Sequence, residues 1–199
     1  MFESCRGHHF GDVLDIIFQS FLLVFASEMG DKTQLLALVL AAKFHKPWAI
    51  MAGILVATIF NHALAASCGG WLSAHIDPEY LKWILALTFF GFAAWILIPD
   101  KDEELNGSYP YGAFLTTTVT FFLAEMGDKT QLATIALGAK FASLLAVTIG
   151  TTLGMLAADG LAVFFGEELT KKIPLKWIRI FTCALFALFG LAIIMGFKF

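Results

Sequence analysis

The sequence has little charge and few cysteines. Only 15% of its 199 residues are charged, while 59% are hydrophobic; a soluble domain usually carries about 25% charged residues. The net charge of −3 argues against a nucleic-acid partner, which would need a basic surface. The 3 cysteines form no disulfide framework and no Cys/His cluster, which argues against structural zinc. With so few polar residues, the apolar surface exceeds one small core, and a bilayer is the natural solvent.

What the sequence has instead is long apolar runs. A helix needs about 20 mostly apolar residues to cross a bilayer. The runs lack the alternation of a membrane β-strand. We therefore expect an all-α integral membrane protein with six transmembrane helices. The six expected spans are Asp15–Ala42, Trp48–Leu72, Leu81–Ile98, Phe114–Ala139, Phe141–Phe165 and Trp177–Phe197.

An internal duplication organises these spans. The octamer EMGDKTQL occurs at Glu28–Leu35 and again at Glu125–Leu132, 97 residues later, and 12 of the 17 positions from Glu28 to Phe44 are identical in the second copy. The same offset pairs Gly53 with Gly150, a small-residue pattern that permits close helix contact. Each half holds three spans, so the second half must enter the membrane from the opposite face. Such inverted repeats are typical of secondary transporters.

The halves and their orientation follow from charge placement. We expect residues 1–99 to form the first three-helix repeat, 100–112 an acidic central loop, and 113–199 the second, inverted repeat. Placing both termini outside leaves seven Lys and Arg residues in inner segments and four in outer ones, as the positive-inside rule favours. The run Lys171–Arg179 is interpreted as an anchor to anionic lipid at the inner surface. We expect a multi-pass protein of a bacterial inner membrane. A homo-oligomer is possible, but no feature indicates one.

Both motif copies fall near the middle of their spans. A charge there costs about 2.5–3.5 kcal/mol on insertion scales, so it needs a partner or a water-filled cavity. In a continuous helix, the motif's Glu, Asp and Gln would form one row, and the two rows would face each other. Converging carboxylate and carbonyl oxygens suit a hard dication such as Ca²⁺, Mg²⁺ or Mn²⁺. The predicted metal ligands are Glu28, Asp31, Gln34, Glu125, Asp128 and Gln131.

Other polar residues of the spans are candidates for supporting or gating roles. Thr33 and Thr130 can add oxygens, or cap a helix that opens at the motif glycine. Lys32 and Lys129 can pair with the acids and join helices, or face a vestibule as gates. Asp159, which the offset pairs with His62, is interpreted as a proton acceptor or outer ligand. The remaining candidates are Asn61 and His62, the latter as a packing residue or a proton relay.

Counting charge suggests a stoichiometry. Four ionised motif carboxylates and two protonated motif lysines leave −2 at the site. One dication or two protons would neutralise that charge. We therefore expect one dication to exchange against two protons.

The sequence EMGDKT at Glu28–Thr33 and Glu125–Thr130 resembles the duplicated Glu-x-Gly-Asp-(Lys/Arg)-(Thr/Ser) signature of the Golgi-type manganese/calcium cation–proton exchanger family, whose bacterial members act as manganese exporters. The resemblance covers essentially the whole chain. It implies that the Glu and Asp of each copy bind the cation, with the two Thr in supporting roles. It implies Mn²⁺ or Ca²⁺ as the transported ion, and the short, prokaryote-like chain favours Mn²⁺ export.

Three other functions remain open. A Ca²⁺/H⁺ exchanger would share the same fold. A passive divalent-cation channel would conduct without a proton gradient. An intramembrane Mg²⁺-dependent lipid-phosphate enzyme fits less well, because that chemistry needs more Lys or Arg beside the acids and an asymmetric site. We expect a transporter and no enzyme, with no cofactor beyond the transported cation, and with protons and the lipid bilayer as its other partners.

Overall fold

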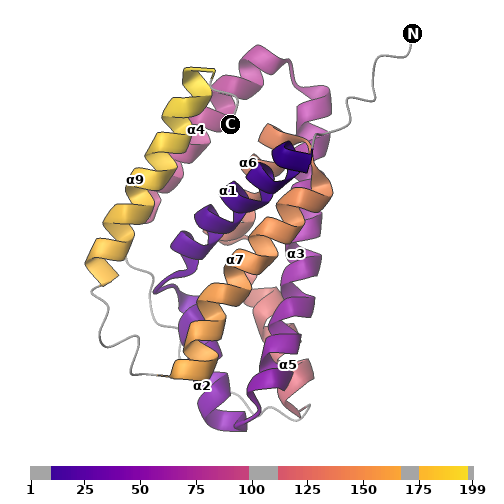
Figure 1. The fold of residues 1–199 in the computed structure, drawn as a ribbon, viewed down its shortest axis with the longest axis vertical. Coiled ribbons are helices and arrows are strands. Elements are labelled where there is room, and N and C mark those ends of the chain that lie inside the picture. Colours follow the sequence, from indigo (N-terminus) through magenta and orange to yellow (C-terminus); the bar gives the residue numbers. More distant parts are fainter. Residues whose placement is uncertain (1–9, 99–111, 167–174, 197–199) are drawn as a thin grey trace.

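The computed structural model describes residues 10–98, 112–166 and 175–196, and these residues form helices with no strand among them. Figure 1 shows the helices running along the long axis, with α1 starting and α9 ending near its upper end. The helices are α1 (Phe10–Glu28), α2 (Lys32–Phe44), α3 (Pro47–His75), α4 (Pro78–Trp95), α5 (Gly112–Glu125), α6 (Lys129–Phe141), α7 (Leu144–Phe165) and α9 (Leu175–Ile194). The predicted acidic central loop lies almost entirely outside the described residues.

Helix boundaries follow from local chemistry. Pro47 and Pro78 open α3 and α4, where proline's missing N–H costs nothing. The Asp77 side chain accepts the Glu79 backbone N–H at 2.9 Å and so caps α4. At the end of α6, Ala142 adopts a left-handed conformation with φ 48°. The predicted boundary at Lys140 between the fourth and fifth spans is therefore two residues too early, because the left-handed Ala142, which no sequence signal marks, ends α6.

The two halves have matching helices at the offset of the duplication. α2 and α6 begin and end 97 residues apart, α3 and α7 begin 97 residues apart, and so do α4 and α9. The first and fourth predicted spans are each split into two helices at the motif. In the first case α1 and α2 are bent by 72°. The segments expected as single spans are thus broken where the charges lie.

Packing joins the halves to each other. Apart from the neighbours α2–α3 and α6–α7, the substantial helix contacts in the described ranges pair a helix of one half with a helix of the other. Gly53 of α3 lies against α5, where an added Cβ would stand 2.8 Å from the Phe114 carbonyl oxygen. Its counterpart Gly150 of α7 lies against α1, at 2.5 Å from the Ile17 carbonyl oxygen. Each glycine permits a backbone approach that any side chain would prevent.

A second contact between the halves is aromatic. Phe89 and Phe92 of α4 pack on their counterparts Phe186 and Phe189 of α9, with ring centroids 5.8–6.0 Å apart. These rings belong to one hydrophobic cluster, while a second cluster joins residues of α1, α2, α3, α5 and α7.

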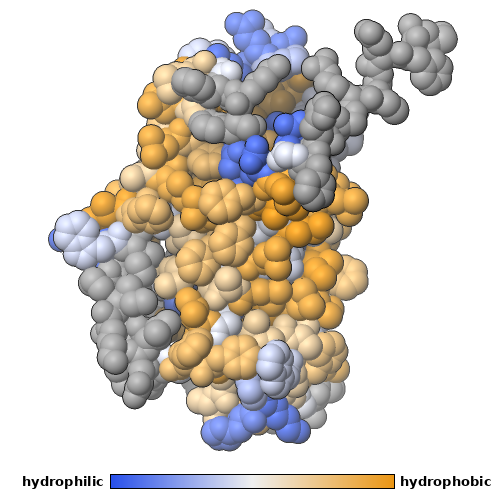
Figure 2. All heavy atoms as spheres, viewed as in Figure 1, coloured by the Kyte–Doolittle hydropathy of each residue, from blue (hydrophilic) through white to orange (hydrophobic). Residues whose placement is uncertain are grey.

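The outer surface is that of a membrane protein. Figure 2 shows mostly apolar residues across the middle of the face in view and most of its hydrophilic residues toward the two ends. In the described ranges, α3 and α7 are long and apolar enough to cross a membrane, and the bent pair α1–α2 makes a third candidate span. Part of α9 and all of α5 are apolar but shorter.

Candidate functional site

Both motif copies form the same helix break. α1 ends at Glu28 and α5 at Glu125, and the following glycines have φ of 80° and 82°. Such left-handed values favour glycine, which has no Cβ to collide with the backbone. The next residues, Asp31 and Asp128, have extended backbones and precede α2 and α6. Each motif is therefore a helix–turn–helix at which an acidic residue stands on either side of the glycine.

The predicted continuous row of Glu, Asp and Gln is wrong, because the break rotates the residues after it. Gln34 Oε1 accepts the backbone N–H of Gly30 at 2.9 Å, and Gln131 Oε1 accepts that of Gly127 at 2.7 Å. Both amide oxygens thus stabilise the turn, satisfying an N–H that the broken helix leaves without a partner. Gln34 also donates from Nε2 to the Ala158 carbonyl oxygen of α7 at 2.9 Å.

Three of the four predicted carboxylates come together. Glu28, Asp31 and Asp128 each offer an oxygen, and these oxygens lie within 4.8 Å of one another. All three side chains are buried. The group contains residues from both halves, so neither motif copy forms it alone. Oxygens at this spacing suit a hard divalent cation.

The fourth carboxylate, Glu125, is buried close to this group. Its charge interacts with those of Glu28, Asp128, Asp159 and Asp31. Neither of its oxygens has a hydrogen-bond partner among the described residues. A buried carboxylate without a partner is costly, so Glu125 needs a proton or a cation.

Both motif threonines donate hydrogen bonds to Glu28. Thr33 donates to Glu28 Oε2 at 2.6 Å, and Thr130, from the other half, donates to Glu28 Oε1. In this structure, the two threonines therefore support Glu28 and not Glu125. The two glutamates differ in this structure although the sequence around them is the same.

The motif lysines pair across the halves. Lys129 Nζ lies 2.5 Å from Asp31 Oδ1, and Lys32 Nζ lies 3.4 Å from Asp128 Oδ1. Each lysine therefore pairs with the aspartate of the other copy. Of the two roles that the sequence left open, the structure shows the one that joins helices. The pairing leaves both glutamates without a lysine partner in these ion pairs.

The remaining candidates, Asn61, His62 and Asp159, are buried. Asn61 donates from Nδ2 to the Phe122 carbonyl oxygen at 3.1 Å. His62 of α3 and Asp159 of α7 are fully buried, and their side-chain nitrogens and oxygens have no hydrogen-bond partner among the described residues. The charge of Asp159 interacts with that of Glu28. Asp159 thus extends the acidic region beyond the motifs.

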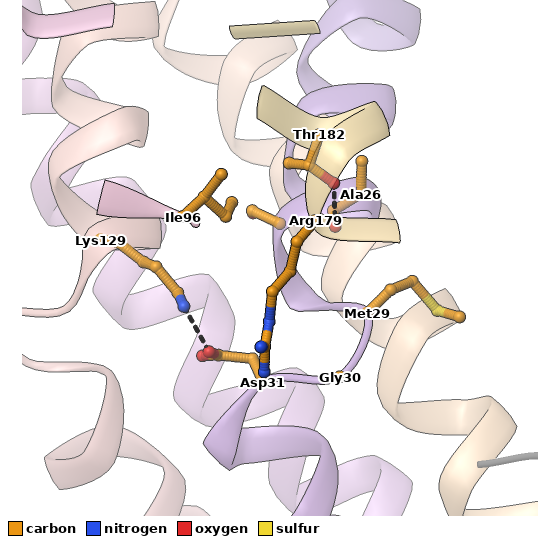
Figure 3. A pocket seen from close by; sticks show the side chains of 9 residues that line it. Ala26, Met29, Gly30, Asp31, Ile96, Lys129, Arg179 and Thr182 are labelled. Atoms are coloured by element: carbon orange, nitrogen blue, oxygen red, sulfur yellow. Dashed lines mark hydrogen bonds and ion pairs between the residues drawn. The ribbon is translucent and has the colours of Figure 1, made fainter. Parts of the chain in front are cut away.

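Sequence reasoning missed Arg179 and Thr182. A pocket beside the first motif is lined by Asp31, Lys129 and, from α9, Arg179 and Thr182. Figure 3 shows the Arg179 side chain extending toward Asp31 and the turn at Gly30. The interpretation of Arg179 as part of a lipid anchor is therefore wrong, while residues 171–174 of that run lie outside the described residues. One signal was present: Arg179 is the single arginine in the six predicted spans.

A helical membrane protein with a buried acidic site shared between its two halves has the features of an ion transporter. The sequence comparisons specify the class. Residues 16–104 and 113–198 match the model of the family described as "Divalent cation/proton antiporter GDT1", and the chain belongs to that family.

Individual proteins that are similar to this chain have descriptions that agree with this family. The chain is 45% identical over 191 residues to a Vibrio cholerae protein described as "Putative manganese exporter", covering 96% of this chain and 94% of that protein. It is 27% identical to GDT1-like protein 3 of Arabidopsis thaliana, over 83% of this chain and 66% of the plant protein. It is 29% identical to the chloroplastic GDT1-like protein 2 of Oryza sativa subsp. japonica, over 89% and 60%. No solved structure matches the chain.

Proposed function

We propose that this protein exports Mn²⁺ in exchange for protons, through a site built by Glu28, Asp31, Glu125 and Asp128. The observation that carries the proposal is the group of carboxylate oxygens drawn from both motif copies. The Vibrio relative's description as a manganese exporter supports the choice of ion and direction. The same site would accept Ca²⁺, which shares the preference for oxygen ligands.

The arrangement proposed for the membrane is six spans in two inverted three-span repeats. The broken pairs α1–α2 and α5–α6 each count as one span, and α3, α4, α7 and α9 supply the others. The matching helix bounds at the 97-residue offset support this count. With both termini outside, α2 and the start of α9 approach the inner surface.

The ion pairs refine the charge count. Two lysine–aspartate pairs balance four of the six motif charges. The remaining −2 belongs to Glu28 and Glu125, so these two glutamates would carry two protons or face one dication. Because the lysines occupy the aspartates, an arriving cation has to displace Nζ from each aspartate that it recruits. Asp159 adds a further acid that can take part in the proton exchange.

Export of a dication must be coupled to the entry of protons. Moving a dication out of a cell against an inside-negative potential costs about 4.6 kcal/mol per 100 mV. A passive channel cannot supply that free energy, whereas protons entering through the same carboxylates can. The paired lysines also leave the lipid-phosphate enzyme with little support, because they are engaged with aspartates and not placed to hold a diphosphate.

Flux in proteoliposomes tests the proposal. Purified protein is reconstituted, an inward or outward pH gradient is imposed, and radioactive Mn²⁺ or Ca²⁺ uptake is followed. We expect uphill Mn²⁺ movement that disappears when the pH gradient is collapsed. Flux that persists unchanged without a gradient would identify a channel, and uphill Ca²⁺ flux exceeding that of Mn²⁺ would identify a calcium exchanger.

A further inference from the structure

The approach to Asp31 is covered by one helix from the other half. α9 supplies Arg179 and Thr182 to the pocket beside the first motif turn. Thr182 donates to the Ala26 carbonyl oxygen of α1 at 2.9 Å, which ties α9 to the last turn before the break. Arg179 lies one helical turn before Thr182, on the same face of α9. Its side chain extends over the turn toward Asp31 (Figure 3).

Among the described residues, α4 gives the second motif no cover that matches the one α9 gives the first. The counterpart of Arg179, 97 residues earlier, is Lys82 of α4, whose Nζ lies 5.9 Å from the ring centre of the adjacent Trp83. The counterpart of Thr182 is Leu85, which cannot donate a hydrogen bond. Correspondingly, Met126 of the second turn is 53% exposed, whereas Met29 of the first turn is partly buried.

The α4–α9 pair is displaced toward one side of the molecule. α9 contacts α1, and α4 contacts α6, while the counterpart contacts of α4 with α5 and of α9 with α2 are weaker. A lysine secures this placement: Lys140 Nζ of α6 lies 4.6 Å from the centre of the Phe189 ring of α9. The two halves therefore have the same helices but hold this pair asymmetrically.

We propose that Arg179 is a gating residue of the transport cycle, which closes the route to Asp31 in this structure and withdraws when the cation exchanges on that side. The proposal rests on the proposed function, since a gate requires a transported ion. Arg179 suits the role because its charge is opposite to that of the carboxylates and the same as that of the cation. It lies near the start of α9, so the gated route is the inner one in the proposed orientation.

Thiol labelling measures access to this pocket without any ion flux. Ser27 lines the pocket and is buried. A reporter Ser27→Cys is placed in a background with Cys5, Cys68 and Cys183 replaced by alanine, and its reaction with a small cationic methanethiosulfonate is timed. Coupling between two sites of a protein typically changes an equilibrium about fivefold or more. We expect Arg179→Gln to raise the labelling rate by that factor and Arg179→Lys to keep the rate low.

Two controls make the result specific. Lys176→Gln removes a charge from the same helix at an exposed position and is expected to leave the rate unchanged. A reporter at Ala124, the counterpart of Ser27, is expected not to react faster in Arg179→Gln. An unchanged rate at residue 27, or an equal rise at both reporters, overturns the gate.

A cross-link tests the gate in protein that keeps Arg179. Cysteines at Ala26 and Thr182 join α1 to α9 where the hydrogen bond now lies. We expect oxidation to stop Mn²⁺ flux and a reductant to restore it. Flux that continues after complete cross-linking overturns the gate. Protein that moves no Mn²⁺ even when reduced, alongside inactive wild type, instead contradicts the proposed function, and the labelling result still decides the gate.

Discussion

The two ion pairs between the halves give unequal stability, and the inequality can be predicted from their geometry. Lys129 and Asp31 are 2.5 Å apart, and their side chains are 9% and 1% exposed. Lys32 and Asp128 are 3.4 Å apart, and the lysine is 27% exposed. Removing one partner of a buried pair costs about 3–5 kcal/mol, because the other charge stays buried. An exposed pair contributes about 0–1 kcal/mol.

We therefore expect Lys129→Met to lower the free energy of unfolding by about 3 kcal/mol, the lower limit for a buried pair. Lys32→Met should lower it less, by about 1–2 kcal/mol, because Lys32 is 27% exposed, although the Asp128 that it leaves behind is only 8% exposed. The double variant Lys129→Met/Asp31→Asn should recover most of the first loss, since it also removes the buried Asp31 charge that Lys129→Met alone leaves unpaired by that lysine. Unfolding in SDS, followed by circular dichroism, measures each value.

The comparison of the two lysines is the critical result. Equal losses of unfolding free energy for Lys129→Met and Lys32→Met would contradict the difference between a pair that is buried on both sides and a pair in which the lysine is partly exposed. A double variant that is no more stable than Lys129→Met would show that the loss comes from packing and not from charge.

Three further predictions concern transport and the motif turn. Glu28→Gln should abolish Mn²⁺ flux in proteoliposomes while the protein still elutes as a folded species, and retained flux would refute its place in the site. Lys32→Met should alter the pH dependence of flux more than the yield of folded protein, and an unaltered profile would count against displacement of its Nζ. Gly127→Ala should destabilise the protein by about 1–3 kcal/mol, because alanine is strained at φ 82°; Gly91→Ala, in an open and helical position, should not.

Hydrophobicity and the duplication allowed much of the architecture to be predicted. The expected apolar segments correspond to α3, α4, α7 and α9 and to the two broken pairs, because burial in lipid requires long apolar runs whatever the packing. The close contacts at Gly53 and Gly150 were predictable from the duplication, because a small residue at equivalent positions of both halves indicates backbone contact.

The details of the site depend on the break and could not be predicted from periodicity. A row of Glu28, Asp31 and Gln34 assumes a continuous helix, and a glycine at φ 80° ends that helix between the first two. The amide oxygen then turns back to the glycine N–H. Each lysine pairs with the other copy's aspartate, 96 residues away for Lys32 and 98 for Lys129, so no local pattern indicates these contacts. Arg179 was misread because a basic residue near a span end is usually a lipid contact.

The exchange of packing partners between the halves has a consequence for how the chain is made. Because α3 lies on α5 and α7 lies on α1, the first half leaves the ribosome before the helices that cover it exist. The surface of α3 at Gly53 therefore faces lipid until α5 inserts. The halves therefore behave as two subunits of a heterodimer that happen to share one polypeptide. Cutting the chain between α4 and α5 and co-expressing the fragments should still yield a working assembly, whereas either fragment alone should be degraded.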